Sequence, residues 1–164
     1  MDLFESIRKN DERFPQLLEK CKDINIKDED GQSLIHVAAA NGNLVAAREL
    51  ISAGIDVNSV DSDGNTPLHY AAEYQNASMA DILLNAGGKI SNKNKHGNTP
   101  VWTAVFNARG NYLLVESFMR FNGFHYVDIK NKYGKSPLDF ARQIGDTRMI
   151  QILTGSEEDA SLGE

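Results

Sequence analysis

A single cysteine, Cys21, is present among the 164 residues. One thiol excludes an intrachain disulfide and a zinc site built from several thiolates. Cys21 continues an apolar stripe with Phe14, Leu17 and Leu18, which predicts a buried, unreactive side chain rather than a nucleophile. The scarcity of cysteine favours a reducing compartment, and we expect a cytoplasmic protein.

Long apolar runs and an excess of positive charge are also missing. No segment approaches the length that spans a bilayer, and the opening MDLFESIRKNDERF lacks the apolar core of a signal peptide. Lys and Arg number 17 against 23 Asp and Glu, so the formal net charge is −6. Nucleic acids and anionic membranes require clustered positive charge, and neither is expected as the main partner.

Catalytic and metal-binding motifs are likewise absent. The chain contains no G-x-S-x-G, H-E-x-x-H, P-loop or paired-cysteine motif. The acidic stretch DSDGNTPLHYAA invites comparison with a calcium loop, but aligning Gly64 as its sixth residue puts Ser59 first and Tyr70 twelfth, where carboxylates are required. We therefore expect no enzyme, no catalytic residue, no cofactor and no resident metal.

A repeated pattern is the dominant feature of what is present. Gly31, Gly64 and Gly97 are spaced 33 residues apart, and Gly134 follows after 37. Each glycine lies in a similar frame: DEDGQSLIHVAA, DSDGNTPLHYAA, NKHGNTPVWTAV and NKYGKSPLDFAR. A fixed period in this range indicates an array of repeated structural units.

Each recurring residue type has a physical role in such a unit. Glycine after the acidic residues permits a tight turn with positive φ. Ser or Thr supplies a helix N-cap two residues later, and proline can follow at the first helical position. Paired alanines keep the first helix slim, whereas bulky apolar pairs such as Leu83–Leu84 fill the second. Gly54, Gly87 and Gly123 are expected to end the second helices in the left-handed conformation.

In these motifs the chain resembles the ankyrin-repeat family over about residues 24 to 153. The resemblance implies an all-α solenoid of about five stacked helix pairs with protruding β-turn or hairpin tips. It also implies that His36 and His69, in the TPLH position, hydrogen-bond the turns rather than bind metal. Trp102 and Asp139 occupy the same position in the later repeats, so the repeats share no catalytic histidine at this position.

The expected domain organisation is a single ankyrin-repeat domain over residues 1–155. It comprises a degenerate N-terminal capping repeat (1–30), three complete repeats (31–63, 64–96 and 97–133) and a truncated C-terminal capping repeat (134–155). An acidic disordered tail is expected over 156–164, and no second domain is expected within these 164 residues.

Two departures from the pattern are visible. Gln75 stands where the preceding repeat has Gly42, and a non-glycine residue would cost about 1–2 kcal/mol in the left-handed conformation. We therefore expect a locally altered helix connection there. The third complete repeat has four extra residues around FNARGNY and RFNGFHYVD, an aromatic insertion between Phe106 and Tyr126.

The resemblance places partner binding on residues beside the turn glycines and at the ends of the first helices. Carried over by position, the candidate partner-binding residues are Glu29, Asp30, Gln32, Asn41, Ser62, Asp63, Asn65, Glu73, Tyr74, Lys93, Lys95, His96, Asn98, Phe106, Asn107, Lys132, Tyr133 and Lys135.

Charge and aromatic content distinguish this set. The first two turn tips are acidic and the last two are basic, which either orients a partner or merely keeps the array soluble. Tyr74, Phe106 and Tyr133 are aromatic residues of the kind enriched in interface hot spots.

These features favour a non-catalytic module that binds a folded protein or a peptide on a concave face. A sharper version is a stand-alone inhibitor or immunity protein that blocks an effector or toxin; the alternative is an adaptor or targeting subunit of an enzyme complex. Both need the same surface, so the sequence does not separate them, and it does not identify the partner or the source. The free protein is expected to be a monomer.

Overall fold

The structure is a computed structural model that describes residues 2–156. Within this part, ten α-helices and one 3₁₀ helix follow one another along the chain. They are α1 (Leu3–Arg8), α2 (Phe14–Glu19), α3 (Leu34–Asn41), α4 (Leu44–Ser52), α5 (Pro67–Glu73), α6 (Ala77–Asn85), α7 (Pro100–Asn107), α8 (Leu113–Arg120), η1 (Gly123–Tyr126), α9 (Pro137–Ile144) and α10 (Thr147–Thr154).

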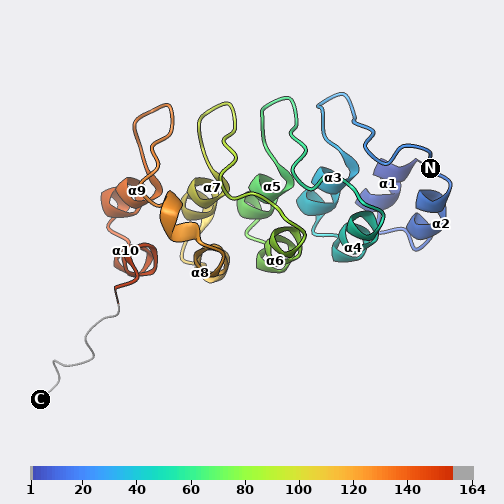
Figure 1. The fold of residues 1–164 in the computed structure, drawn as a ribbon. Coiled ribbons are helices and arrows are strands. Elements are labelled where there is room, and N and C mark those ends of the chain that lie inside the picture. The colour runs from blue at the N-terminus through green and yellow to red at the C-terminus, as the bar shows by residue number, and fades with distance from the viewer. Residues whose placement is uncertain (1, 157–164) are drawn as a thin grey trace, which may run out of the picture.

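The helices form antiparallel pairs that stack in a row. Figure 1 shows α1, α3, α5, α7 and α9 lying beside one another next to the protruding loops, with their partners α2, α4, α6, α8 and α10 in a second row. The only β pairing in residues 2–156 is an isolated bridge between Lys27 and Ser33. The expected all-α array of five helix pairs is confirmed. The domain and repeat boundaries given above remain a prediction.

The first helices begin where the N-cap pattern predicts. Thr66, Thr99 and Ser136 adopt extended backbone conformations immediately before the helical Pro67, Pro100 and Pro137. Proline costs nothing there because the first N–H of a helix has no intrahelical partner.

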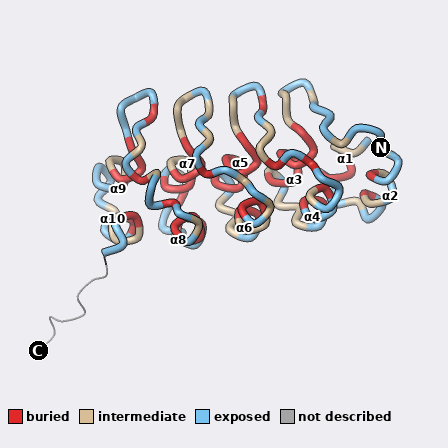
Figure 2. Tube along the Cα trace, viewed as in Figure 1, coloured by how far each residue is buried: buried red, intermediate tan, exposed pale blue. Residues whose placement is uncertain are grey.

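Small residues and large residues divide the core between the two rows of helices. Ala38 and Ala71 in the first row are fully buried, as are Leu83 and Phe118 in the second. Small side chains let neighbouring first helices approach closely, and large ones fill the space beneath them. Figure 2 shows the buried residues as a continuous band along the array, between the two rows.

The protruding loops end in four tips, residues 28–32, 61–65, 94–98 and 131–135, which we call tips 1 to 4. In each tip the first residue closes the turn; Asn94, for example, accepts hydrogen bonds from the N–H groups of His96 and Asn98 at 3.0 and 3.1 Å. One backbone hydrogen bond joins each tip to the next, as from Lys95 N to Asp63 O at 2.8 Å. The tips therefore form one connected row.

Packing between tips gives a testable difference between two glycines. Gly31 and Gly134 have similar positive φ values of 75° and 71°. A Cβ on Gly31 would lie 2.8 Å from Ser62 Oγ and 2.9 Å from its backbone nitrogen, whereas a Cβ on Gly134 would meet nothing within 4 Å. Gly134→Ala should thus cost only the left-handed strain, about 1–2 kcal/mol, and Gly31→Ala clearly more. Urea unfolding of both variants measures the difference; equal losses would show that contact between tips adds nothing.

Two expectations about helix ends are wrong. Gln75 keeps the left-handed conformation, with a φ of 54°, and its Nε2 donates hydrogen bonds to Ala72 O and Ala104 O at 2.8 and 3.0 Å. These bonds offset the strain, so the connection is not altered. In the third complete repeat Asn122, with a φ of 69°, takes the left-handed position in place of Gly123. Gly123 is instead required by space, because its Cβ would lie 2.6 Å from Phe118 O.

The extra residues of the third complete repeat also have a clear location. The connection between α7 and α8 runs over residues 108–112, whereas only Gly42 and Asn43 separate α3 from α4. The turn after α8 contains η1, which has no counterpart in the other described repeats.

Cys21 departs from its expected burial. It lies just after α2 and is half-buried, and its Sγ donates to the Asp23 carbonyl at 3.0 Å. The helix ends at Glu19, so the stripe that predicted burial stops before Cys21.

Most of the predicted acidic tail, residues 157–164, lies outside the described residues. In residues 2–156 the helices reach nine residues at most, and none has the length and hydrophobicity that crossing a membrane requires.

Candidate interaction surface

Two buried histidines join the first helices to the next tips. His69 Nδ1 accepts a hydrogen bond from the Thr66 backbone N–H at 3.1 Å, and its Nε2 lies 2.9 Å from the Asn98 carbonyl oxygen of tip 3. His36 makes the same contacts to Ser33 and to the Asn65 carbonyl of tip 2. Since a carbonyl can only accept, Nε2 carries the proton. The structural role expected for both histidines is confirmed.

Burial determines the charge state of these histidines. Burial lowers the pKa of His69 to about 4, although the Asn98 carbonyl and Asp61 act in the opposite direction. Burial likewise lowers the pKa of His36. A proton on Nδ1 would face the N–H group of the N-cap residue, so the geometry agrees with a neutral ring.

Asp61, the buried acid of the stretch DSDGNTPLHYAA, is a structural residue. Its carboxylate accepts hydrogen bonds from Tyr70 Oη at 2.8 Å and from the backbone N–H groups of Asp63 and Asn65 at 2.9 and 2.8 Å. Burial raises the pKa of Asp61, but these hydrogen bonds outweigh it and hold the pKa below the ordinary value. Among residues 2–156, no three metal-ligating side chains lie close enough to hold an ion.

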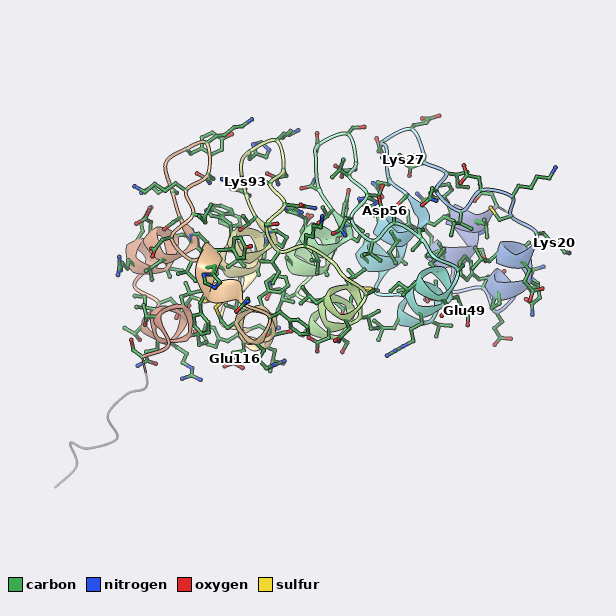
Figure 3. All side chains as sticks on the ribbon, viewed as in Figure 1. Lys20, Lys27, Glu49, Asp56, Lys93 and Glu116 are labelled. Carbon is green, nitrogen blue, oxygen red and sulfur yellow. The ribbon has the colours of Figure 1, made fainter. Side chains whose placement is uncertain are left out.

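The predicted partner-binding residues lie along one face of the array. None of them is buried. All except Lys93, which precedes tip 3, belong to the tips or to the adjoining ends of the first helices. Figure 3 shows the orientation of this face: Lys27 and Lys93 lie in the segments leading to the tips, whereas Glu49 and Glu116 lie along the second row of helices. We call this tip-side surface the concave face, after the concave binding surface that repeat arrays commonly present.

Several predicted contact residues are already engaged within the chain. The amide groups of Asn41 and Asn107 donate to Val37 O and Thr103 O of their own helices. Asn65 and Asn98 accept side-chain hydrogen bonds from Asn94 and Asn131 of the following tips, both at 2.9 Å. These four asparagines help to build the face as well as line it.

The charge order of the tips is partly cancelled in its middle. Lys95 Nζ of tip 3 lies 2.6 Å from Asp63 Oδ1 of tip 2, an exposed ion pair between neighbours. Tip 1 keeps the exposed Glu29 and Asp30, and tip 4 keeps the exposed Lys132 and Lys135. The face is therefore negative at its first tip and positive at its last.

The aromatic residues do not form the single group that their sequence suggests. Tyr74, Phe106 and Tyr133 are 57%, 51% and 69% exposed, but Tyr133 stacks on His96 between tips 3 and 4. Phe106 stacks on Trp102 instead, with ring centroids 5.0 Å apart and planes within 18°.

Phe140 of α9 completes this second group, 5.2 Å from Phe106 and 6.1 Å from Trp102. We call Trp102, Phe106 and Phe140 the aromatic wall. Trp102 and Phe140 were missed as candidate residues, although the four-residue spacing of Trp102 and Phe106 places both on one helix face.

A pocket of about 300 Å³ opens between α5, α7 and tips 2 and 3. Trp102 and Phe106 line one side, and Glu73 from the end of α5 lies among the other lining residues. The predicted residues Asn65, His96, Asn98 and Asn107 line it too. Together with Glu73 and Phe106, a third of all the candidate partner-binding residues therefore surround one pocket.

Comparison with known proteins agrees with this architecture. A family model of ankyrin repeats in three copies matches residues 3–94, and a search of curated proteins found no match. The capped first helices and linked tips continue through α7 and α9, beyond the matched residues. Ankyrin repeats are generally protein–protein interaction modules and typically non-catalytic. Since the match spans more than half of the sequence and the fold repeats its unit throughout, this chain belongs to the ankyrin-repeat family.

Proposed function

We propose that this protein binds a protein partner through its concave face, at the predicted residues of the tips and first-helix ends. The exposed aromatic side chains on that face carry the proposal. Tyr74, Phe106 and Tyr133 each leave half or more of their surface in water, and large aromatic residues contribute strongly when an interface covers them.

The connected row of tips supports binding to a folded surface. Hydrogen bonds between neighbouring tips and the histidine contacts beneath them hold the face in place without a partner. A preorganised face loses little conformational freedom on association. A partner with the reverse charge order, positive opposite tip 1 and negative opposite tip 4, would be oriented as it approaches.

We propose further that binding itself inhibits the partner, as in an immunity protein against an effector or toxin. Occluding an active surface requires only the concave face. The adaptor alternative requires a second binding surface in addition, because an adaptor holds two proteins at once. An inhibitor lowers the partner's own activity, whereas an adaptor leaves it intact, so a measurement of that activity separates the two roles.

The test compares affinity captures with the wild-type protein and with two double variants, followed by mass spectrometry. Tyr74→Ala with Phe106→Ala removes exposed side chains from the concave face; Val45→Ala with Leu113→Ala removes exposed side chains, 67% and 66% accessible, from elsewhere. We expect the first pair to weaken binding of the purified partner at least 30-fold, from about 2 kcal/mol per hot spot, and the second to leave it unchanged.

The purified partner then decides the role. Loss of its activity in a 1:1 complex supports the inhibitor, and retained activity with recruitment of a third protein supports the adaptor. If the concave-face variant binds like wild type while the control variant does not, the interface lies on another face.

A further inference from the structure

The pocket between α5 and α7 combines the stacked rings of Trp102 and Phe106 with an unpaired carboxylate. Glu73 and Phe106 occupy equivalent positions in neighbouring first helices, each the seventh residue from the helix start. Both side chains are exposed and both line the pocket. No hydrogen bond or ion pair among residues 2–156 engages the Glu73 carboxylate, so it is available to a ligand.

The charge of the pocket is negative. Glu73 is the only carboxylate among its lining residues, and no lysine or arginine lines it. His69, at its base, stays neutral because burial lowers its pKa to about 4. Lys95, the one lysine within tip 3, pairs with Asp63. The other polar lining groups are mainly asparagine amides, whose oxygens accept hydrogen bonds.

This combination selects among possible occupants. An aliphatic side chain would cover the aromatic wall but would strip water from Glu73 without pairing it, which is costly. A carboxylate would be repelled. A lysine ammonium pairs with Glu73 as a point charge, whereas a planar guanidinium both stacks on an aromatic ring and donates several hydrogen bonds in a fork.

We propose that the pocket is an anchor site for an arginine side chain of the protein partner, with the guanidinium stacked on Phe106 and hydrogen-bonded to Glu73. The proposal rests on the proposed function and adds the chemistry that the concave face recognises. The aliphatic stem of the arginine covers the edge of the wall. The Asn107 amide oxygen, which accepts no hydrogen bond among residues 2–156, accepts one of the remaining N–H groups.

A direct test uses the full-length protein and the indole N–H signal of Trp102, the only tryptophan, in ¹H–¹⁵N NMR spectra. The probe is the capped tripeptide acetyl-Gly-Arg-Gly-amide; matched peptides carry Lys, Gln or Leu at the centre. We expect saturable shifts of the Trp102 signal with the arginine peptide, with a dissociation constant on the order of millimolar, weaker ones with lysine, and none with glutamine or leucine.

Two variants establish the cause of that signal. Glu73→Gln should weaken arginine binding about tenfold and remove the preference for arginine over glutamine. Glu49→Gln, on α4 in the second row, should bind like wild type. The fold of each variant is checked from the rest of its spectrum. Absence of shifts, equal binding of the leucine peptide, or unchanged binding by Glu73→Gln would overturn the arginine site.

The same variants separate this proposal from the proposed function. If Tyr74→Ala with Phe106→Ala weakens the protein partner but Glu73→Gln does not, the concave face binds and the arginine anchor is wrong. If neither substitution affects the partner, the proposed interface on the concave face is wrong, and arginine-peptide binding at Glu73 would then be unrelated to that partner.

Discussion

Lowering the pH from 7 to 5 should reduce the free energy of unfolding by about 2 kcal/mol through His69 alone. The pKa of His69 is about 4 in the folded protein against an ordinary value of 6.5. Between these values the unfolded chain binds a proton that the folded chain excludes, so stability falls as the pH falls below about 6.5. The loss levels off below about pH 4. His36 acts in the same direction, because burial lowers its pKa as well.

Urea unfolding at pH 7, 6 and 5 measures this dependence, and His69→Gln is the matched variant. A glutamine side chain can still accept from the Thr66 N–H, as in a capping box, but it does not titrate. The variant should lose most of the His69 contribution to the slope. The carboxylates Asp61 and Asp139, whose pKa values are lowered, titrate below this window. An unchanged slope in His69→Gln would show that the ring is not buried as a neutral group.

Phe118→Ala should reduce the free energy of unfolding by about 4 kcal/mol, the largest loss expected from one side chain. Phe118 is fully buried in α8 and is the largest side chain with no exposure. Its removal leaves a cavity beneath α7 that the short helices of the third complete repeat cannot close. Leu113→Ala, at the exposed start of the same helix, is the control and should change stability by less than about 0.5 kcal/mol.

The location of the loss is as informative as its size. In a repeat array each unit contacts only its neighbours, so a defect can unfold one part first. Trp102 lies in α7, the partner of α8, and its fluorescence reports on the affected repeat. We expect the fluorescence transition of Phe118→Ala to precede the circular dichroism transition, whereas both coincide in the wild type. Coincident transitions in the variant would mean that the array unfolds as one unit.

Most of the fold could be predicted from the sequence because its determinants are local and repeated. The N-cap residue, the following proline and the turn glycine each impose a backbone conformation on their own segment, and the 33-residue period places successive segments side by side. The errors occur where a residue departs from the repeated pattern. Gln75 keeps the left-handed turn by donating a hydrogen bond to Ala104 O of the next repeat. Such a contact between repeats cannot be predicted from the residues next to Gln75.

The wrong prediction that Gly123 takes the left-handed conformation has a similar cause. Both Asn122 and Gly123 can serve as helix-ending residues, and the choice between them depends on the close approach of Phe118 O and Met119 Cε. The candidate surface shows the same limit. The face could be assigned by position, but the stacking of Phe106 on Trp102 and the pairing of Lys95 with Asp63 depend on the spacing between repeats.

The bonds from His36 to the Asn65 carbonyl and from His69 to the Asn98 carbonyl have a consequence for how such a gene can change length. Because both bonds recur after the same 33 residues, a tandem copy of residues 64–96 would present the histidine of one copy to the carbonyl acceptor of the next. Unequal recombination at this joint therefore yields a longer array in which the added joint keeps the histidine bond. The following joint differs, since Trp102 has replaced the histidine there, and a copy of the third complete repeat would lack that bond.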